Sequence, residues 1–117
     1  MRQRLEENGH LWIEAWNSRD LERVLSLYDE RVEMVSGVII RLGINPDGRV
    51  LGKSDLRAYW ARALETLPNL HFTLLDLSVS PDSVVVRYVN AKGSTICEYL
   101  RVGANGKIIQ GSANHLI

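Results

Sequence analysis

Apolar side chains recur every three or four residues through the first half of the chain, which is the period of an amphipathic helix. The first stripe consists of Leu5, Trp12, Ala15 and Trp16. Residues 17–20 then read as a stop and restart, with Ser18 or Asp20 as the cap of a second helix whose stripe is Leu21, Val24, Leu25 and Tyr28. A third helix opens at residues 53–55 and is closed by Pro68, with Leu56, Trp60, Ala63, Leu64 and Leu67 inward.

Two segments between the second and third helices have strand character. Residues 31–35 alternate between polar and apolar side chains, and residues 38–44 are rich in β-branched side chains. The sequence Asn-Pro-Asp-Gly at 45–48 is a strong turn signal. We therefore expect short strands here.

The second half of the chain predicts a sheet. Four β-rich runs cover residues 70–80, 83–90, 94–102 and 107–115, separated by spacers of two to four residues. Such spacers force antiparallel hairpins, because a parallel crossover needs a dozen or more residues. Helices that precede a long meander form one layer on one face of the sheet. The pattern predicts one soluble α+β domain spanning residues 1–117.

The order of these elements and the amino-acid sequences of four segments resemble one known family. The matching segments are AWNSRDLERVLSLYDERVEM (15–34), GKSDLRAYW (52–60), LPNLHFTLLDLSVSPDSVVVRYV (67–89) and EYLRVGANGKI (98–108). Together they resemble the SnoaL-like, ketosteroid-isomerase-like branch of the NTF2-like superfamily. The resemblance implies a cystatin-like cone: three helices from the N-terminal half pack on a curved, mainly antiparallel sheet and enclose a pocket. It also implies a homodimer through the convex sheet face.

Composition narrows the classes of partner. Lys plus Arg and Asp plus Glu number 14 each, so the formal net charge is zero. This argues against nucleic acid as a ligand, because nucleic-acid-binding domains carry a basic excess. A net charge of zero also favours self-association. Cys97 is the only cysteine, which fits a reducing cytoplasm. The sequence has no signal-peptide pattern and no apolar run long enough to span a membrane. No HExxH motif, paired cysteines or glycine-rich phosphate motif is present, so we expect neither a metal nor a cofactor.

Strand parity selects the side chains that face the pocket. If residues 103–106 form a four-residue loop, Leu100 lies opposite Ile109 and Glu98 opposite Gly111. The face that results is mostly apolar or small, which suits the concave side, and consists of Ile96, Glu98, Leu100, Ile109, Gly111, Ala113 and His115. The polar side chains of the alternate positions then face solvent or a dimer partner.

Glu98 is the leading catalytic candidate because it is the carboxylate on this apolar face. Burial raises the pKa of such a group and suits it to acid–base catalysis near neutral pH. By resemblance, Glu98 aligns with the acid that ketosteroid isomerases keep neutral as a hydrogen-bond donor to the oxyanion. Two alternatives stay open: Glu98 pairs with Arg87 on the neighbouring strand, or the parity is wrong and Glu98 faces solvent.

His115 is the second catalytic candidate, at the mouth of the same face. The predicted register separates it from Glu98 by four residues, about 13 Å, which is too far for a hydrogen-bonded dyad; the alternative is a histidine at a frayed terminus. The length of the hairpin loop at residues 91–93 decides which side chain of the preceding strand faces the pocket: an even number of loop residues places Arg87 beside Glu98, and an odd number turns Tyr88 inward.

Aromatic side chains at helical spacing form either core or pocket wall. The expected substrate-binding residues are Trp12, Trp16, Tyr28, Trp60, Arg87, Ile96, Leu100 and Ala113.

Two positions depart from the isomerase pattern that the resemblance implies. Trp12 stands where a tyrosine donor is expected, and Ser36 stands where a carboxylate base is expected. An indole donates a hydrogen bond but does not ionise usefully, and an unassisted serine is a poor proton acceptor. Ordinary ketosteroid isomerisation is therefore not predicted. The sequence favours a small-molecule pocket protein of cyclase, isomerase or hydrolase type that uses Glu98. The alternative is a non-catalytic binding or dimerisation module.

Overall fold

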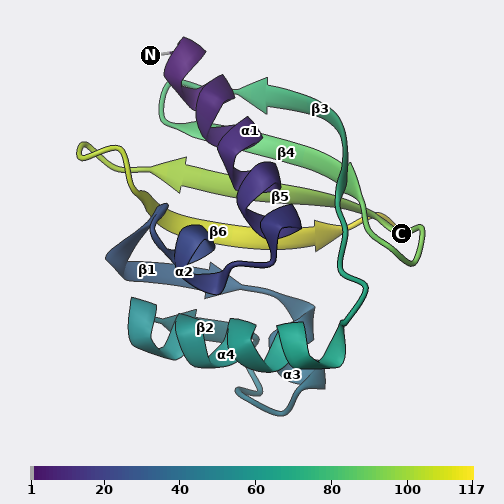
Figure 1. Ribbon diagram of the computed structural model, residues 1–117. Coiled ribbons are helices and arrows are strands. Elements are labelled where there is room, and N and C mark those ends of the chain that lie inside the picture. Colours follow the sequence, from purple (N-terminus) through teal and green to yellow (C-terminus); the bar gives the residue numbers. More distant parts are fainter. Residues whose placement is uncertain (1) are drawn as a thin grey trace.

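The computed structural model describes residues 2–117, with side chains from Gln3 onward, and it contains four helices and one six-stranded sheet (Figure 1). The helices are α1 (Arg2–Ser18), α2 (Leu21–Leu25), α3 (Gly37–Arg41) and α4 (Lys53–Thr66). The strands are β1 (Tyr28–Val35), β2 (Arg49–Leu51), β3 (Thr73–Val79), β4 (Ser83–Val89), β5 (Thr95–Val102) and β6 (Ile108–His115). No helix within residues 2–117 is both long and apolar enough to cross a bilayer.

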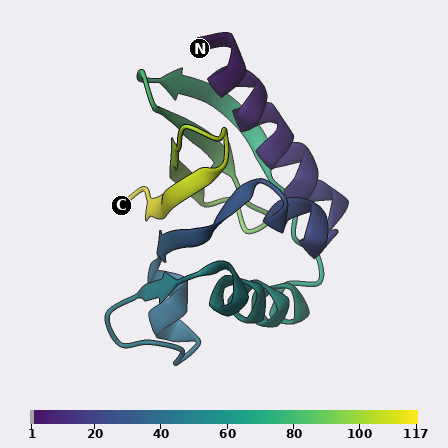
Figure 2. The same ribbon diagram turned by 90° about the vertical axis from the view of Figure 1, so that its left-hand side faces the viewer.

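The sheet is mixed and has the strand order β2-β1-β6-β5-β4-β3. The β3–β4–β5–β6 meander is antiparallel, as the short spacers predict, whereas β1 pairs with β6 in parallel. Helix α1 packs on β3 and β4, and α4 packs on β1 and β2. Both long helices lie on the same side of the curved sheet (Figure 2). The predicted α+β architecture is confirmed.

The second helix ends earlier than its apolar stripe predicts. Asp20 caps α2, and its side chain accepts a hydrogen bond from the backbone N–H of Arg23. The helix stops at Leu25, and Tyr28 is the first residue of β1. The assignment of Tyr28 to the helix was therefore wrong. Val24, Leu25 and Tyr28 are nevertheless all buried in the same core. The apolar pattern therefore predicted the burial of these side chains correctly, although the helix ends before Tyr28.

The β-branched run at residues 38–44 is the other wrong assignment, because residues 37–41 form α3. Ser36 caps this helix, and its hydroxyl accepts a hydrogen bond from the Val38 N–H at 3.2 Å. One turn of helix buries Ile39 and leaves Ile40 exposed. The capping hydrogen bond and this one-sided burial outweigh the modest strand preference of the β-branched side chains.

The hairpin between β5 and β6 differs from the predicted register by two residues. Its loop has five residues, closed by the Gly103 N–H donating to the Lys107 carbonyl, and a bulge follows at the start of β6. Leu100 consequently lies opposite Gly111, and Glu98 lies opposite Ala113. Each irregularity inserts one residue, so the two together restore the predicted faces. Ile109 is the exception, since Ile108 is the residue buried in the core there.

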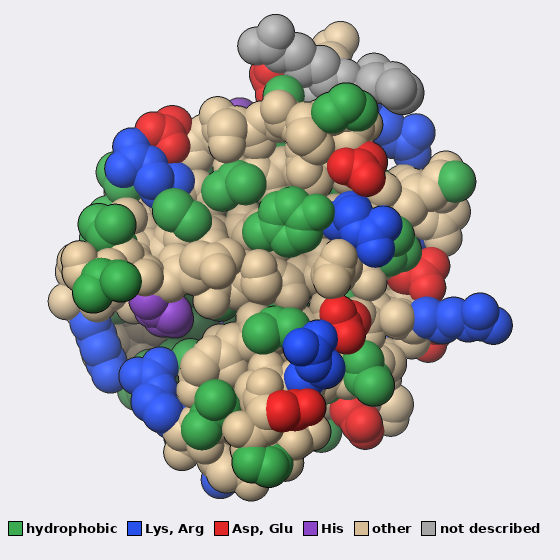
Figure 3. All heavy atoms as spheres, turned by 180° about the vertical axis from the view of Figure 1, so that it is seen from behind, with side chains coloured by type: hydrophobic (Ala, Val, Ile, Leu, Met, Phe, Trp, Pro, Cys, Tyr) green, Lys and Arg blue, Asp and Glu red, His purple; other side chains and the backbone are tan. Residues whose placement is uncertain are grey.

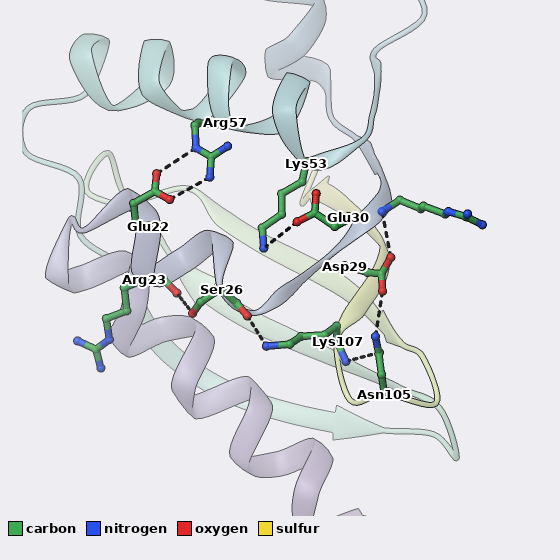
Figure 4. A network of polar contacts seen from close by, with 10 residues as sticks. Glu22, Arg23, Ser26, Asp29, Glu30, Lys53, Arg57, Asn105 and Lys107 are labelled. Carbon is green, nitrogen blue, oxygen red and sulfur yellow. Dashed lines mark hydrogen bonds and ion pairs between the residues drawn. The ribbon is translucent and has the colours of Figure 1, made fainter.

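One end of the molecule is tied together by polar contacts. Lys107 donates to the Ser26 carbonyl at 2.7 Å, Asn105 donates to Asp29, and Arg57 of α4 forms a bidentate ion pair with Glu22 of α2 (Figure 4). The contacts link α2, α4, β1 and the β5–β6 loop. At the opposite end the α4–β3 connection, the β4–β5 loop and the end of β6 lie together (Figure 1), and the Asn17 side chain of α1 is hydrogen-bonded to the backbone of Phe72 in that connection.

Candidate functional site

A cavity of about 630 Å³ lies between the helices and the concave face of the sheet. Trp12 and Trp16 of α1 and Tyr59 and Trp60 of α4 form one wall, and the sheet forms the other through Tyr88, Ile96, Glu98 and Ala113. The residues of α3 and of the α4–β3 connection complete its rim. The volume is in the range of sites for small organic ligands. A second hollow of about 510 Å³, between α4 and residues 44–51, shares only Tyr59 with it.

Glu98 is buried in this cavity wall, with 3% of its surface exposed. Its cross-strand neighbours are Val86 and Ala113, neither of which carries a charge. Burial raises the pKa of the Glu98 carboxyl to about 7, and a hydrogen bond from the Tyr88 hydroxyl acts in the opposite direction. That hydrogen bond spans 3.2 Å to Oε1. A carboxyl group with such a pKa can take up and release a proton near neutral pH.

Tyr88 faces the cavity and Arg87 does not. The hairpin register pairs Val89 with Thr95, which makes the loop five residues long, an odd number. Arg87 lies on the outer face, exposed, and forms a bidentate ion pair with Asp76 of β3. The expectation that Arg87 lines the pocket was wrong, and so was the alternative that it neutralises Glu98. Burial and the nearby Glu98 charge raise the pKa of Tyr88, so its hydroxyl remains a proton donor.

His115 lies on the predicted face at the edge of the cavity and is exposed. It pairs with Ile96, so it is two positions along the strands from Glu98 and Ala113 instead of four. The offset between His115 and Glu98 along the strand direction is therefore about 7 Å, half of that predicted. The pairing of β6 with β5 continues past His115, because the Leu116 N–H donates to the Thr95 carbonyl.

The aromatic side chains form a connected cluster along the cavity. Trp12 stacks on Phe72 with ring centroids 5.7 Å apart, and Trp16 meets Trp60 edge to face at 5.0 Å. Tyr28 is behind this wall: it does not line the cavity, and its hydroxyl accepts a 2.8 Å hydrogen bond from the Trp12 indole. Leu100 is likewise completely buried beneath the cavity. Tyr28 and Leu100 are thus core residues, which corrects their expected place in the lining.

The two positions that depart from the isomerase pattern have internal partners. The Trp12 N–H is used by Tyr28, and the Ser36 hydroxyl accepts the hydrogen bond that caps α3. Ser36 also contacts Tyr59, where burial raises the pKa of the phenol to about 12 and the Ser36 hydroxyl opposes that rise. Neither Trp12 nor Ser36 supplies a proton acceptor to the cavity.

Several lining residues were missed from the sequence. Tyr59, Phe72 and Arg41 line the cavity, but Phe72 lies in a connection and Arg41 lies on the unexpected helix α3. Tyr59 precedes Trp60, and both are buried in a helix that packs against α2 as well as against β1 and β2. A helical stripe drawn only through Leu56, Trp60 and Ala63 omits this flank. A wider apolar arc on α4 was the available signal.

These features define a class: cone-shaped α+β domains of NTF2-like type, with an aromatic-lined cavity and a buried carboxyl on the sheet. The sequence matches the SnoaL-like domain model over residues 10–111. The chain belongs to the SnoaL-like family.

Solved structures show the same fold. A SnoaL-like protein of unknown function from Burkholderia thailandensis is 32% identical, with a TM-score of 0.93 and coverage of 100% of this chain and 98% of that chain. TerC, co-crystallised with polyporic acid, is 19% identical, with a TM-score of 0.78 and coverage of 97% and 91%. A ketosteroid isomerase-like fold from Catenulispora acidiphila, in complex with trimethylamine, is 18% identical, with a TM-score of 0.74 and coverage of 92% and 83%. No curated protein matches the sequence.

Proposed function

We propose that the protein is a small-molecule enzyme of isomerase, cyclase or hydrolase type that acts on an apolar, ring-containing substrate with Glu98 as its acid and base. One observation carries the proposal: a carboxyl group is buried in the wall of a largely apolar cavity, its cross-strand neighbours Val86 and Ala113 carry no charge, and burial raises its pKa to about 7. A buried carboxylate without a compensating charge lowers the stability of the folded protein. A catalytic role of Glu98 in proton transfer accounts for a group that costs stability at this position.

The chemistry that fits is proton transfer within one substrate. The Glu98 carboxylate takes a proton from a carbon next to a carbonyl, which leaves an enolate. The carboxylic acid so formed returns that proton to another carbon, or to the oxygen, of the same molecule, and the carboxylate is regenerated. The Tyr88 hydroxyl lies 3.2 Å from Glu98 and stabilises the carboxylate form. The indole and phenol rings orient a planar substrate and exclude water.

Replacement of Glu98 by Gln tests this assignment. Gln retains the shape and hydrogen bonding of the side chain but cannot accept a proton, so turnover should fall by at least about 100-fold while binding persists. The measurement is product analysis with a panel of cyclic and polyketide-like ketones. The exposed Glu65→Gln variant in α4 is the matched control and should keep full activity. Unchanged turnover in Glu98→Gln would contradict the role.

Tyr88→Phe provides a second arm with a different readout. Loss of the Tyr88 hydroxyl removes the interaction that lowers the pKa of Glu98. The acidic limb of the rate profile should move to higher pH. A merely structural role of Tyr88 would lower the rate at every pH without moving that limb.

A non-catalytic ligand-binding module is the second candidate. Its support is that the polar groups of Trp12 and Ser36 are engaged in internal hydrogen bonds. Glu98 is then the one carboxyl group among the described residues that line the cavity, without the second catalytic group that isomerases of this type use. Tryptophan fluorescence that saturates on addition of a ketone, without any product, would favour this function over catalysis.

We also propose that a second copy of the chain covers the outer face of the sheet. This face carries half-buried side chains on β5 and β6 that include Thr95, Cys97, Tyr99, Arg101, Gln110 and Ser112. A net charge of zero lowers the electrostatic barrier to self-association.

A further inference from the structure

The rim of the cavity is chemically different from its interior. Four basic side chains line the rim: Arg41, His71, Lys92 and His115, all exposed. The single carboxyl among the described lining residues is Glu98, deep on the sheet. Because the whole chain has a formal net charge of zero, this rim is a local concentration of positive charge.

Three of the four basic residues at the rim, Arg41, Lys92 and His71, are held by different local structures. Arg41 is in the last turn of α3, whose cap is Ser36. Lys92 lies in the β4–β5 loop, where the Asn90 carboxamide oxygen accepts hydrogen bonds from the N–H groups of both Lys92 and Ser94 at 3.0 Å. His71 precedes Phe72, whose backbone N–H and carbonyl are both bound by the Asn17 side chain. Local structure therefore brings these three groups to one opening, which His115 also reaches as the last residue of β6.

Arg41 and Lys92 form no ion pair with any described carboxylate, whereas Arg49, Arg57 and Arg87 each do. Seen from behind Figure 1, the surface is hollowed, with histidine atoms at the edge of the hollow and Lys or Arg side chains beside it, and with Asp and Glu side chains lying away from it (Figure 3). An anion at this opening would meet cations whose charge is not already neutralised.

We propose that the ligand is an amphipathic anion, an apolar ring system with one carboxylate, which binds with its ring in the cavity and its carboxylate at the rim. This inference rests on the proposed function and names its substrate class. The charges also set the direction of binding. A carboxylate directed inward would approach the Glu98 carboxyl in an apolar wall, whereas a carboxylate at the rim meets Arg41 and Lys92 in water. The ring carbons are thereby presented to Glu98.

Calorimetric titration with 2-naphthoate and its neutral counterpart 2-naphthamide tests the proposal without any turnover. At low salt the carboxylate should bind about five- to tenfold more tightly than the amide, as two partly screened ion pairs allow. The preference should shrink in 0.5 M salt. In an Arg41→Gln, Lys92→Gln double variant the preference should disappear while affinity for the amide is retained. Arg31→Gln, which changes an exposed arginine of β1 outside the cavity, is the control and should keep the preference.

Three results would overturn the proposal: equal binding of the two probes, a preference that survives loss of both cations, or a gain of more than about tenfold in naphthoate affinity in Glu98→Gln, which would place the carboxylate inward. Binding of the amide alone would leave the cavity function intact and remove only the anion preference. Binding of neither probe would count against both the cavity function and this inference. Loss of turnover in Glu98→Gln is independent of all these results.

Discussion

Glu98 shows how one residue takes its chemistry from its surroundings. The same side chain exposed on a helix is an ordinary carboxylate, but here Val86, Ala113 and the aromatic wall replace water around it. Burial raises its pKa to about 7, and the Tyr88 hydrogen bond limits that rise. The group is therefore poised between its two protonation states at neutral pH, which an acid–base role requires.

The raised pKa predicts a specific dependence of stability on pH. In the unfolded chain Glu98 loses its proton near pH 4.5, whereas in the folded protein it holds the proton until about pH 7. Its contribution to stability is thus fully present below pH 4.5 and is lost as pH rises to about 7, by roughly 3 kcal/mol at ~1.4 kcal/mol per pKa unit. The free energy of unfolding of Glu98→Gln minus that of the unmodified protein should grow by this amount between pH 4.5 and 8.

Urea denaturation at a series of pH values measures this difference. Other carboxylates, such as Asp76 and Glu22, have lowered pKa values and change stability in the opposite sense. Their effect cancels in the difference between the two proteins. A difference that is constant across the range would show that Glu98 titrates normally.

Helix α3 is the element on which the rim depends. It is only five residues long and starts with the Ser36 capping hydrogen bond. It carries Arg41 to the opening, and Ile39 anchors it in the core. A helix this short has little intrinsic stability and is held by its cap and its one buried side chain.

Ser36→Ala should therefore loosen this element. Loss of the cap is worth about 1 kcal/mol, and the measured free energy of unfolding should fall by that amount. Ser36→Thr, which keeps a hydroxyl at the cap, should retain most of the stability. Hydrogen exchange of the Val38 amide reports the local effect. Equal protection in Ser36→Ala and the unmodified protein would show that the cap does not stabilise α3.

At the scale of the whole molecule, the two ends of the cone differ. The end that contains α2, the start of α4 and the β5–β6 loop is joined by the Glu22–Arg57 and Lys107–Ser26 contacts. The other end carries the cavity opening and is formed by connections and strand ends.

The proposed dimer is also a property of the whole molecule. Sedimentation equilibrium at micromolar concentration should give about twice the chain mass of 13.2 kDa. Tyr99→Glu adds a charge on the half-buried outer face of β5 and should shift the equilibrium to monomer. The exposed Glu65→Gln variant of α4 should remain dimeric. A monomer in the unmodified protein would contradict the proposal.

The α+β architecture, the end of α1, the boundaries of α4 and of the last three strands, and the cavity-facing positions of Ile96, Glu98 and Ala113 were predictable from sequence. Period and parity are local properties: a helix repeats near 3.6 residues and a strand near two, whatever lies against them. The same local rules failed at residues 37–41, where a cap and one buried side chain determined the structure.

Only the tertiary structure decided which long-range partners each residue has. The odd loop placed Tyr88, not Arg87, beside Glu98, and the five-residue loop with its bulge brought His115 to within two positions of Glu98. The rim was also invisible in the sequence, because Arg41, His71, Lys92 and His115 are far apart along the chain. A single inserted residue in a turn changes register without changing composition or period. Sequence therefore determined which faces are apolar, and the packing of turns and strands decided which charges meet there.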